Sequence, residues 1–342
     1  MAQTALVVAE DAANPSVRPR ASRGWWLRLG VSVGLLSWLC ASVDWGQVAQ
    51  LSLNLRLNWI VPALFLNAAC RFLTTCKWDV LLRGKDLSYP YAYLLRMVWI
   101  STFFGTFLPS GIGADSVRML AMARGNHKAP EIVSTVVAER LTGLFSLAGL
   151  AVLGGLWCYG LWGKPQLTLT LLVPVGVLLV GLTVLWTQPG NLLLRLVLNR
   201  LQRLPGYAFL TKLHEALRAY RYEPQPLLTA LVISGAIQLA RVSLIYLLAR
   251  ALGLTLAFGD ALFLVPIAFF ITLLPISVGY LGVQEGAFVV LLSLARIETS
   301  AAFGLSILFR LLNLAVDLPG VVMFLAHGVK PPQIAVVARE NV

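Results

Sequence analysis

Seven charged side chains of this 342-residue chain stand within or beside long apolar stretches of sequence. An ionisable group in apolar surroundings costs about 2.5–3.5 kcal/mol on membrane-insertion scales, so it normally faces a partner or a polar cavity. The seven are Arg71, Asp115, Arg118, Glu139, Arg140, Glu285 and Arg310. Guanidinium binds phosphate through a planar fork of donors, so the four arginines among them predict a site for an anionic group.

Arg140 and Arg310 are the first candidates for binding the anionic group. Each follows one copy of a repeated sequence motif, and the number of residues between motif and arginine is similar in both cases. Glu139 and Arg140 are neighbours on a helix and point about 100° apart, so at least one of them needs a partner elsewhere. We expect ion pairs between the two halves of the chain, either Glu285 with Arg140 or Asp115 with Arg310. Two other readings stay open, in which Asp115 caps a helix or the whole cluster is a buried structural network.

Arg241, Asp317 and Asp79 are weaker candidates, since each fits a place near a membrane interface. The three histidines and four cysteines have no metal-ligand spacing, and no nucleophile set or glycine-rich phosphate loop occurs. The sequence therefore predicts no enzyme, no cofactor and no metal site.

The repeated sequence motif, which we call the repeated phrase, is expected to position these charges. Residues 103–117 and 269–283 match at seven positions with a constant offset of 166. Both copies break an apolar run, the first at Pro109, Gly111 and Gly113 and the second at Pro275 and Gly279. A half-helix that begins after each break directs free N–H groups and a positive dipole end toward the membrane centre, which favours anions.

The composition indicates an all-α polytopic membrane protein, with 58% apolar residues, 12% charged residues and a mean hydropathy of +0.79. Six segments are long enough to span: 25–44, 58–82, 131–158, 167–187, 226–252 and 300–326. The two phrases lie in shorter stretches, 91–108 with 114–124 and 259–275 with 280–296. Each pair predicts a re-entrant helical hairpin, whose irregular backbone must line a cavity or be buried in protein.

Lys and Arg residues concentrate in the amino tail and in segments 83–128 and 188–225, which places these on the cytoplasmic side. Both termini are then cytoplasmic, and the hairpins open to opposite sides. This predicts an inverted-topology repeat, as in many secondary transporters, with copies at about 58–158 and 226–326. The whole forms a single membrane domain over 25–328 between a disordered tail, 1–24, and a short tail, 329–342.

The basic connector 188–225 either lies on anionic lipid headgroups or is a solvated loop. The net charge of +12 does not indicate nucleic-acid binding, because the basic residues stand mostly next to apolar runs.

Several motifs resemble the flippase-like transmembrane region of the lysylphosphatidylglycerol synthases, over about residues 25–328. They are Arg71 with Trp78 and Leu81–Gly84, the element F-x-x-x-F-L-P-S-G-I-G-A-D-x-V-R ending at Arg118, Glu139-Arg140-Leu141-x-Gly143, L-P-x-S-x-G-x-x-G with Gln284-Glu285, and Arg310. The second element has Tyr280 where the family pattern favours a more glycine-rich turn. The soluble aminoacyl-transferase domain of the synthases is not expected here.

The resemblance implies a lipid translocase in a bacterial inner membrane. Its substrate would be a phospholipid, an aminoacyl-phospholipid or an isoprenoid or polyprenyl-linked lipid, with an anionic or zwitterionic headgroup held by the seven charged residues. A second hypothesis is a membrane scaffold for a separate lipid-modifying enzyme or glycosyltransferase. A third, a membrane-embedded enzyme with Asp115 or Glu285 as base, is the weakest because no nucleophile or metal set accompanies them.

Overall fold

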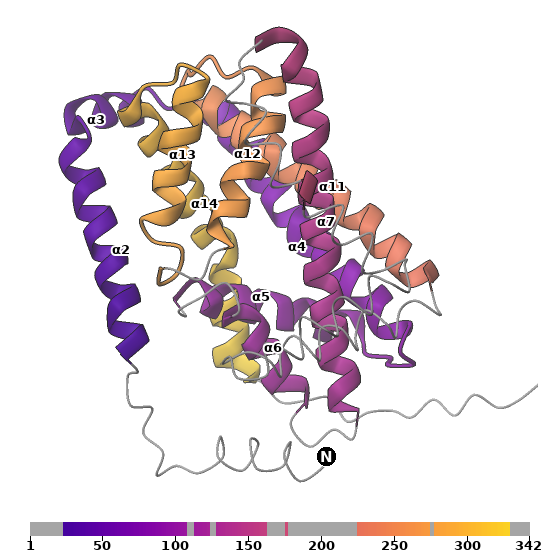
Figure 1. Ribbon diagram of the computed structural model, residues 1–342. Helices are drawn as coiled ribbons and strands as arrows, with labels where there is room; N and C mark the ends of the chain where they lie inside the picture. Colours follow the sequence, from indigo (N-terminus) through magenta and orange to yellow (C-terminus); the bar gives the residue numbers. More distant parts are fainter. Residues whose placement is uncertain are drawn as a thin grey trace, which may run out of the picture.

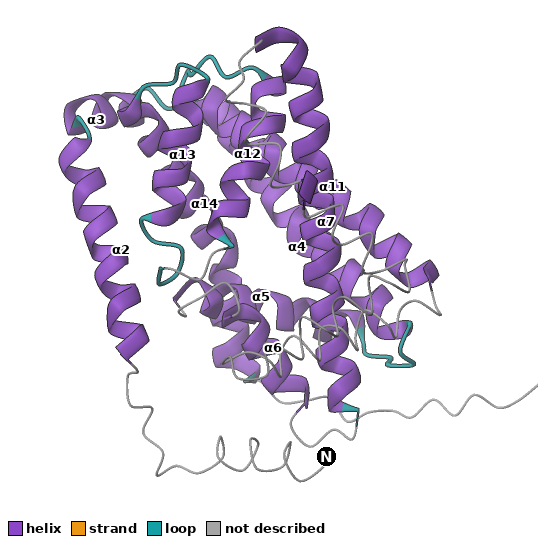
Figure 2. Ribbon diagram, viewed as in Figure 1, coloured by secondary structure: helices purple, strands orange, loops and turns teal. Residues whose placement is uncertain are grey.

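The computed structural model describes residues 23–107, 113–123, 128–162, 175–176, 224–273 and 277–328. Within these residues the regular elements are ten α-helices, which confirms the all-α polytopic fold (Figure 2). Pro109, Gly111 and Pro275 lie outside the described residues. So do the predicted span 167–187, the connector 188–225, most of the amino tail and the carboxyl tail.

Four helices of the described residues are long and apolar enough to cross a membrane. They coincide with predicted spans: α4 (Leu57–Arg83), α7 (Ala129–Trp162), α11 (Pro224–Ala251) and α14 (Thr299–His327). Helix α2 (Arg23–Ser42) occupies the predicted span 25–44, although its apolar stretch, Gly30–Ser42, is shorter.

One helix, α3 (Trp45–Leu53), forms where the sequence indicated only an outer connection. The Asp44 carboxylate caps it by accepting hydrogen bonds from the backbone N–H groups of Gly46 and Gln47.

The two predicted hairpins are present. The first consists of α5 (Tyr91–Phe107) and α6 (Gly113–Ala123), and the second of α12 (Phe258–Thr272) and α13 (Val283–Leu294). Figure 1 shows the first hairpin opening toward the end of the molecule where α2 begins and the second toward the opposite end. We call α4 to α7 repeat one and α11 to α14 repeat two. Their opposite directions agree with the predicted inverted repeat.

The second break is longer than the repeated phrase indicates, because α13 begins at Val283 and not at residue 280. Gly279, Tyr280 and Gly282 all adopt positive φ, at 57°, 61° and 79°, so the chain stays non-helical through them. The offset between corresponding positions therefore rises from 166 to 170 past the break. The positive φ of Tyr280 also explains why a glycine would suit this position.

Each hairpin packs on a long helix of the other repeat: α5 lies against α14, and α12 lies against α7. Glycines allow the close approach. A Cβ atom at Gly320 of α14 would stand 2.4 Å from the Trp99 carbonyl oxygen, and one at Gly154 of α7 would stand 2.6 Å from that of Leu262. Repeat one is thereby held against repeat two by small-residue packing, as is usual between membrane helices.

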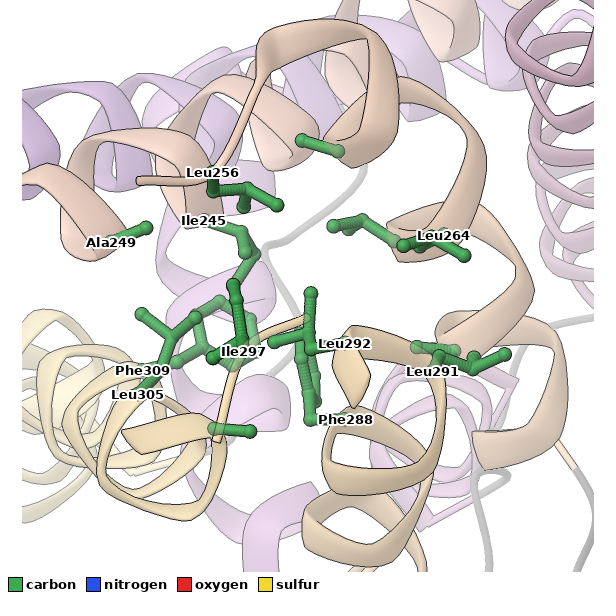
Figure 3. Packing of buried hydrophobic residues seen from close by; sticks show 14 of the residues in the cluster. Ile245, Ala249, Leu256, Leu264, Phe288, Leu291, Leu292, Ile297, Leu305 and Phe309 are labelled. Carbon is green, nitrogen blue, oxygen red and sulfur yellow. The ribbon is translucent and has the colours of Figure 1, made fainter. Parts of the chain in front are cut away.

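The returning arm α13 is held in an apolar core, in which Phe288 and Leu292 belong to one buried cluster with side chains of three other helices (Figure 3). These are Ile245 and Ala249 of α11, Leu264 of α12, and Leu305 and Phe309 of α14. This packing positions the break at residues 277–282 against the middle of the molecule.

Candidate functional site: a charged central cavity

A cavity of about 320 Å³ lies where the two hairpins meet, lined by residues of both repeats. The break of the second hairpin touches the first arm of the other hairpin, because a Cβ atom at Gly279 would stand only 2.4 Å from the Thr106 carbonyl oxygen. Gly279 and Tyr280 form part of the cavity wall. Irregular backbone thus lines a cavity here, as membrane burial requires.

Positive charge exceeds negative charge around this cavity. Its lining includes the carboxylates Asp115, Glu139 and Asp317, and Glu285 lies directly behind Arg310 without exposed surface. Six basic residues line the cavity, namely Arg71, Lys77, Arg118, Arg140, Arg241 and Arg310. They exceed the four acidic residues by two positive charges. Six of the seven charged residues identified from the sequence therefore line one cavity. The seventh, Glu285, pairs with Arg310 in the cavity wall.

The returning arm of the first hairpin is tied to α7 by a charged network. Arg118 contacts Asp115 at 2.6 Å and Glu139 at 2.9 Å, and Lys77 Nζ lies 3.8 Å from a Glu139 carboxylate oxygen. The other oxygen of Asp115 accepts a hydrogen bond from Arg140 Nε. Glu139 and Arg140 thus find separate partners, as predicted. Both carboxylate oxygens of Asp115 pair with arginines, so Asp115 does more than cap a helix.

The second hairpin has one corresponding pair. Arg310 lies 2.6 Å from Glu285, and it also donates to the backbone carbonyls of Gly279 at 3.2 Å and Tyr280 at 3.4 Å. Glu285 in turn accepts from the Gly282 N–H at 2.7 Å. Arg310 therefore satisfies the exposed backbone of the break.

The expected pairs Glu285 with Arg140 and Asp115 with Arg310 are wrong. Both carboxylates pair within their own repeat, because each returning arm packs directly on the helix that follows it, α6 on α7 and α13 on α14.

An ion pair does join the repeats, but between other residues. Arg71 of α4 donates two hydrogen bonds to the Asp317 carboxylate of α14, one of 2.8 Å from Nε and one of 3.0 Å from Nη2. Thr102 of α5 donates to the same carboxylate at 3.1 Å. Both charges are almost fully buried, so the expectation that Asp317 lies near an interface is wrong. Asp79 instead pairs with Arg83, which is 65% exposed.

Arg241 also lines the cavity and not a membrane interface. Its guanidinium carbon lies 5.8 Å from the centre of the Phe269 ring, and within the described part of the chain it forms no ion pair. The sequence held one signal for it: the offset from Arg71 to Arg241 is the same as the offset from Arg140 to Arg310.

Three polar residues of the wall were also missed by sequence reasoning. The described residues supply no hydrogen-bond partner for Ser234 Oγ, Gln238 Oε1 or Gln284 Nε2, although all three atoms are buried. Uncharged residues in apolar helices give no signal in the sequence, since they occur commonly in helix packing. In the described residues no cluster of His, Cys, Asp and Glu has the arrangement of a metal site.

Comparison with known proteins supplies a family. Residues 25–320 match the family described as the lysylphosphatidylglycerol synthase TM region. A comparison with curated proteins finds no match. The matched range includes both hairpins and all of the charged residues that line the cavity.

Proposed function

Because the chain belongs to the lysylphosphatidylglycerol synthase transmembrane-region family, a multi-pass membrane family connected with lipids, we propose that it is a lipid translocase. In this proposal the central cavity holds an anionic headgroup while the acyl chains stay in the bilayer. The observation that carries it is the excess of positive charge in a cavity enclosed by two inverted hairpins. Charged groups at this depth are costly and usually mark a substrate pathway.

The size of the cavity supports a headgroup and not a whole lipid. At about 320 Å³ it lies at the lower end of the range for small-molecule sites. Arg140 has 43% of its side chain exposed and Arg310 has 19%. A phosphate bound directly to either arginine would have to displace the carboxylate that already pairs with it. In this proposal the two arginines therefore attract the headgroup without holding its phosphate tightly, which lets the headgroup leave on the other side.

Movement between leaflets requires the cavity to open alternately to each side. The inverted hairpins provide two related halves for this exchange, and each half packs on the opposite repeat through close helix contacts. Rocking of one repeat against the other would exchange the open side, with the lipid biasing the populations. The Arg71 to Asp317 pair crosses the boundary between repeats and would resist or guide this motion.

The proposal is tested with purified protein in liposomes that contain a tail-labelled anionic lipid, phosphatidylglycerol. A membrane-impermeant reductant quenches the outer-leaflet label, and translocation exposes the inner-leaflet label to it. We expect faster loss of the protected fraction than in liposomes that carry heat-denatured protein. Equal rates, together with co-purification of a lipid-modifying enzyme or glycosyltransferase, would favour the scaffold hypothesis instead.

A further inference from the structure

The cavity contains hydrogen-bonding atoms that nothing in the described chain uses. Ser234, Gln238 and Gln284 are 1%, 6% and 9% exposed, and each has one buried polar atom without a partner. Gln238 uses its amide nitrogen on the Gly143 carbonyl oxygen at 3.3 Å, so its free atom is an acceptor. Buried polar groups are almost always hydrogen-bonded in native proteins. These atoms therefore indicate a ligand that completes them.

Two of these residues share a helix face with Arg241. Ser234, Gln238 and Arg241 occupy positions i, i+4 and i+7 of α11, and all three line the cavity. At a rise of 1.5 Å per residue they form a strip about 10 Å long. We call these three residues the α11 strip.

Arg241 is the cation of the cavity best placed for an external anion. The other five basic residues of the lining each lie within 4.0 Å of a carboxylate: Arg71, Lys77, Arg118, Arg140 and Arg310. Arg241 contacts only the ring face of Phe269 among the charged or aromatic partners described. A phosphate can approach it without displacing an ion pair.

We propose, building on the translocase function above, that the α11 strip recognises a phosphodiester lipid whose headgroup carries hydroxyl groups. Arg241 binds the phosphate, and the hydroxyls donate to Gln238 Oε1 and exchange a hydrogen bond with Ser234 Oγ. Gln284 Nε2 donates to a remaining oxygen. An ammonium headgroup fits less well because it enters a cavity with an excess of two positive charges, and a choline group has no donor at all.

The test uses two lipids of the same charge, phosphatidylglycerol, whose headgroup carries two hydroxyls, and phosphatidylmethanol, whose methyl headgroup carries none. Their affinities for the full-length protein in non-ionic detergent are compared, with phosphatidylcholine as the zwitterionic reference. We expect phosphatidylglycerol to bind roughly tenfold more tightly than phosphatidylmethanol, because two acceptors gain donors. Equal affinity for these two lipids would overturn the hydroxyl recognition.

Variants assign the two parts of the strip. The double substitution Ser234→Ala with Gln238→Met should remove the preference, so that phosphatidylglycerol binds no more tightly than phosphatidylmethanol. Arg241→Gln should weaken both lipids by about tenfold, whereas Arg250→Gln, an exposed arginine of the same helix, should weaken neither. Unchanged phosphatidylglycerol affinity in Arg241→Gln would refute the phosphate site. If that variant elutes as an aggregate, Arg241→Lys keeps the charge but not the fork, and it should show an intermediate loss.

A competition experiment with a water-soluble compound distinguishes a lipid ligand from a free organic phosphate. Deacylated phosphatidylglycerol should compete far more weakly than the lipid, and equal competition would assign the cavity to a water-soluble solute. Binding in detergent does not depend on movement. Selective binding without translocation in liposomes would therefore contradict the translocase function and support the headgroup recognition. Translocation without selective binding would support the translocase function and contradict the headgroup recognition.

Discussion

Arg310 Nε lies 2.7 Å from Oε1 of Glu285, a residue 25 positions earlier in the chain that has no exposed surface. Arg140 and Asp115 have the same relationship in repeat one, again 25 residues apart. Each pair joins the returning arm of a hairpin to the long helix that follows. The two pairs occupy equivalent positions of the repeats, so the inverted repeat is present in its ion pairs as well as in its helices.

Removing one partner of this pair should be costly. Glu285→Gln leaves the Arg310 guanidinium without its counter-charge in a mostly buried site, and we expect a loss of about 3–5 kcal/mol in the free energy of unfolding. The measurement is denaturant unfolding in detergent.

The matched control for Glu285→Gln is Asp79→Asn, which breaks the exposed pair with Arg83. An exposed pair contributes about 0–1 kcal/mol, so this variant should remain near the wild type. A Glu285→Gln protein as stable as Asp79→Asn would show that the buried pair does not hold the hairpin.

The repeats differ in what accompanies these pairs. Arg118 and Glu139 form a salt bridge of 2.9 Å in repeat one. Phe288 and Phe309 stand at the equivalent positions of repeat two, and their rings lie 6.1 Å apart in a tilted contact. The same position in the fold is thus held by charge in one repeat and by aromatic packing in the other.

This correspondence predicts that repeat one accepts the side chains of repeat two. Leu247 is the equivalent of Lys77 at the same offset, so the triple variant is Lys77→Leu, Arg118→Phe and Glu139→Phe. Well-packed apolar residues in place of a buried ion pair are often neutral or stabilising, so we expect a free energy of unfolding close to the wild type. Arg118→Phe alone should lose about 3–5 kcal/mol. A triple variant no more stable than this single one would contradict the correspondence.

The contact between the hairpins gives a third prediction. Gly279→Ala places a Cβ at positive φ and 2.4 Å from the Thr106 carbonyl oxygen, so both strain and steric overlap should lower the melting temperature in detergent. The strain alone corresponds to about 1–3 kcal/mol. Gly286→Ala is the control, since a Cβ there meets nothing within 4 Å and the change favours helix by about 1 kcal/mol. Similar melting of both variants would refute the tight contact.

Much of the fold was predictable because membrane helices obey strong constraints. A span needs about 20 apolar residues. This rule identified α4, α7, α11 and α14 with only small differences at their ends. Helix α3 was missed, since only the Asp44 cap distinguishes it from a connection.

The site was predictable only in part. Charged residues in apolar sequence are conspicuous, so the members of the cavity wall such as Arg140 were found. Their pairing was not, because the phrase aligned at 166 concealed the offset of 170 that relates Asp115 to Glu285. The extra residues of the second break, with Tyr280 at positive φ, cause that shift. Arg71 and Arg241 are also 170 residues apart, although both precede the breaks, so an alignment of the phrase at 166 does not bring them together either.

The inverted topology itself has a direct test. In a protein whose four cysteines are replaced, single cysteines at exposed Ser88 and Arg296 report the open ends of the two hairpins. We expect a membrane-impermeant maleimide to label Arg296→Cys in intact cells and Ser88→Cys only after permeabilisation. Labelling of both from the same side would contradict opposite hairpins.

The most direct test of the central claim fills the cavity without replacing a charged residue. Gly143 lines the cavity on α7, and a Cβ there would meet only Lys77 Nζ, at 4.0 Å. Gly143→Ala should therefore translocate tail-labelled phosphatidylglycerol in liposomes at about the wild-type rate. Gly143→Trp should fold normally but lose translocation, because the indole occupies the headgroup space. A folded Gly143→Trp protein that moves the lipid as fast as Gly143→Ala would contradict a translocation route through this cavity.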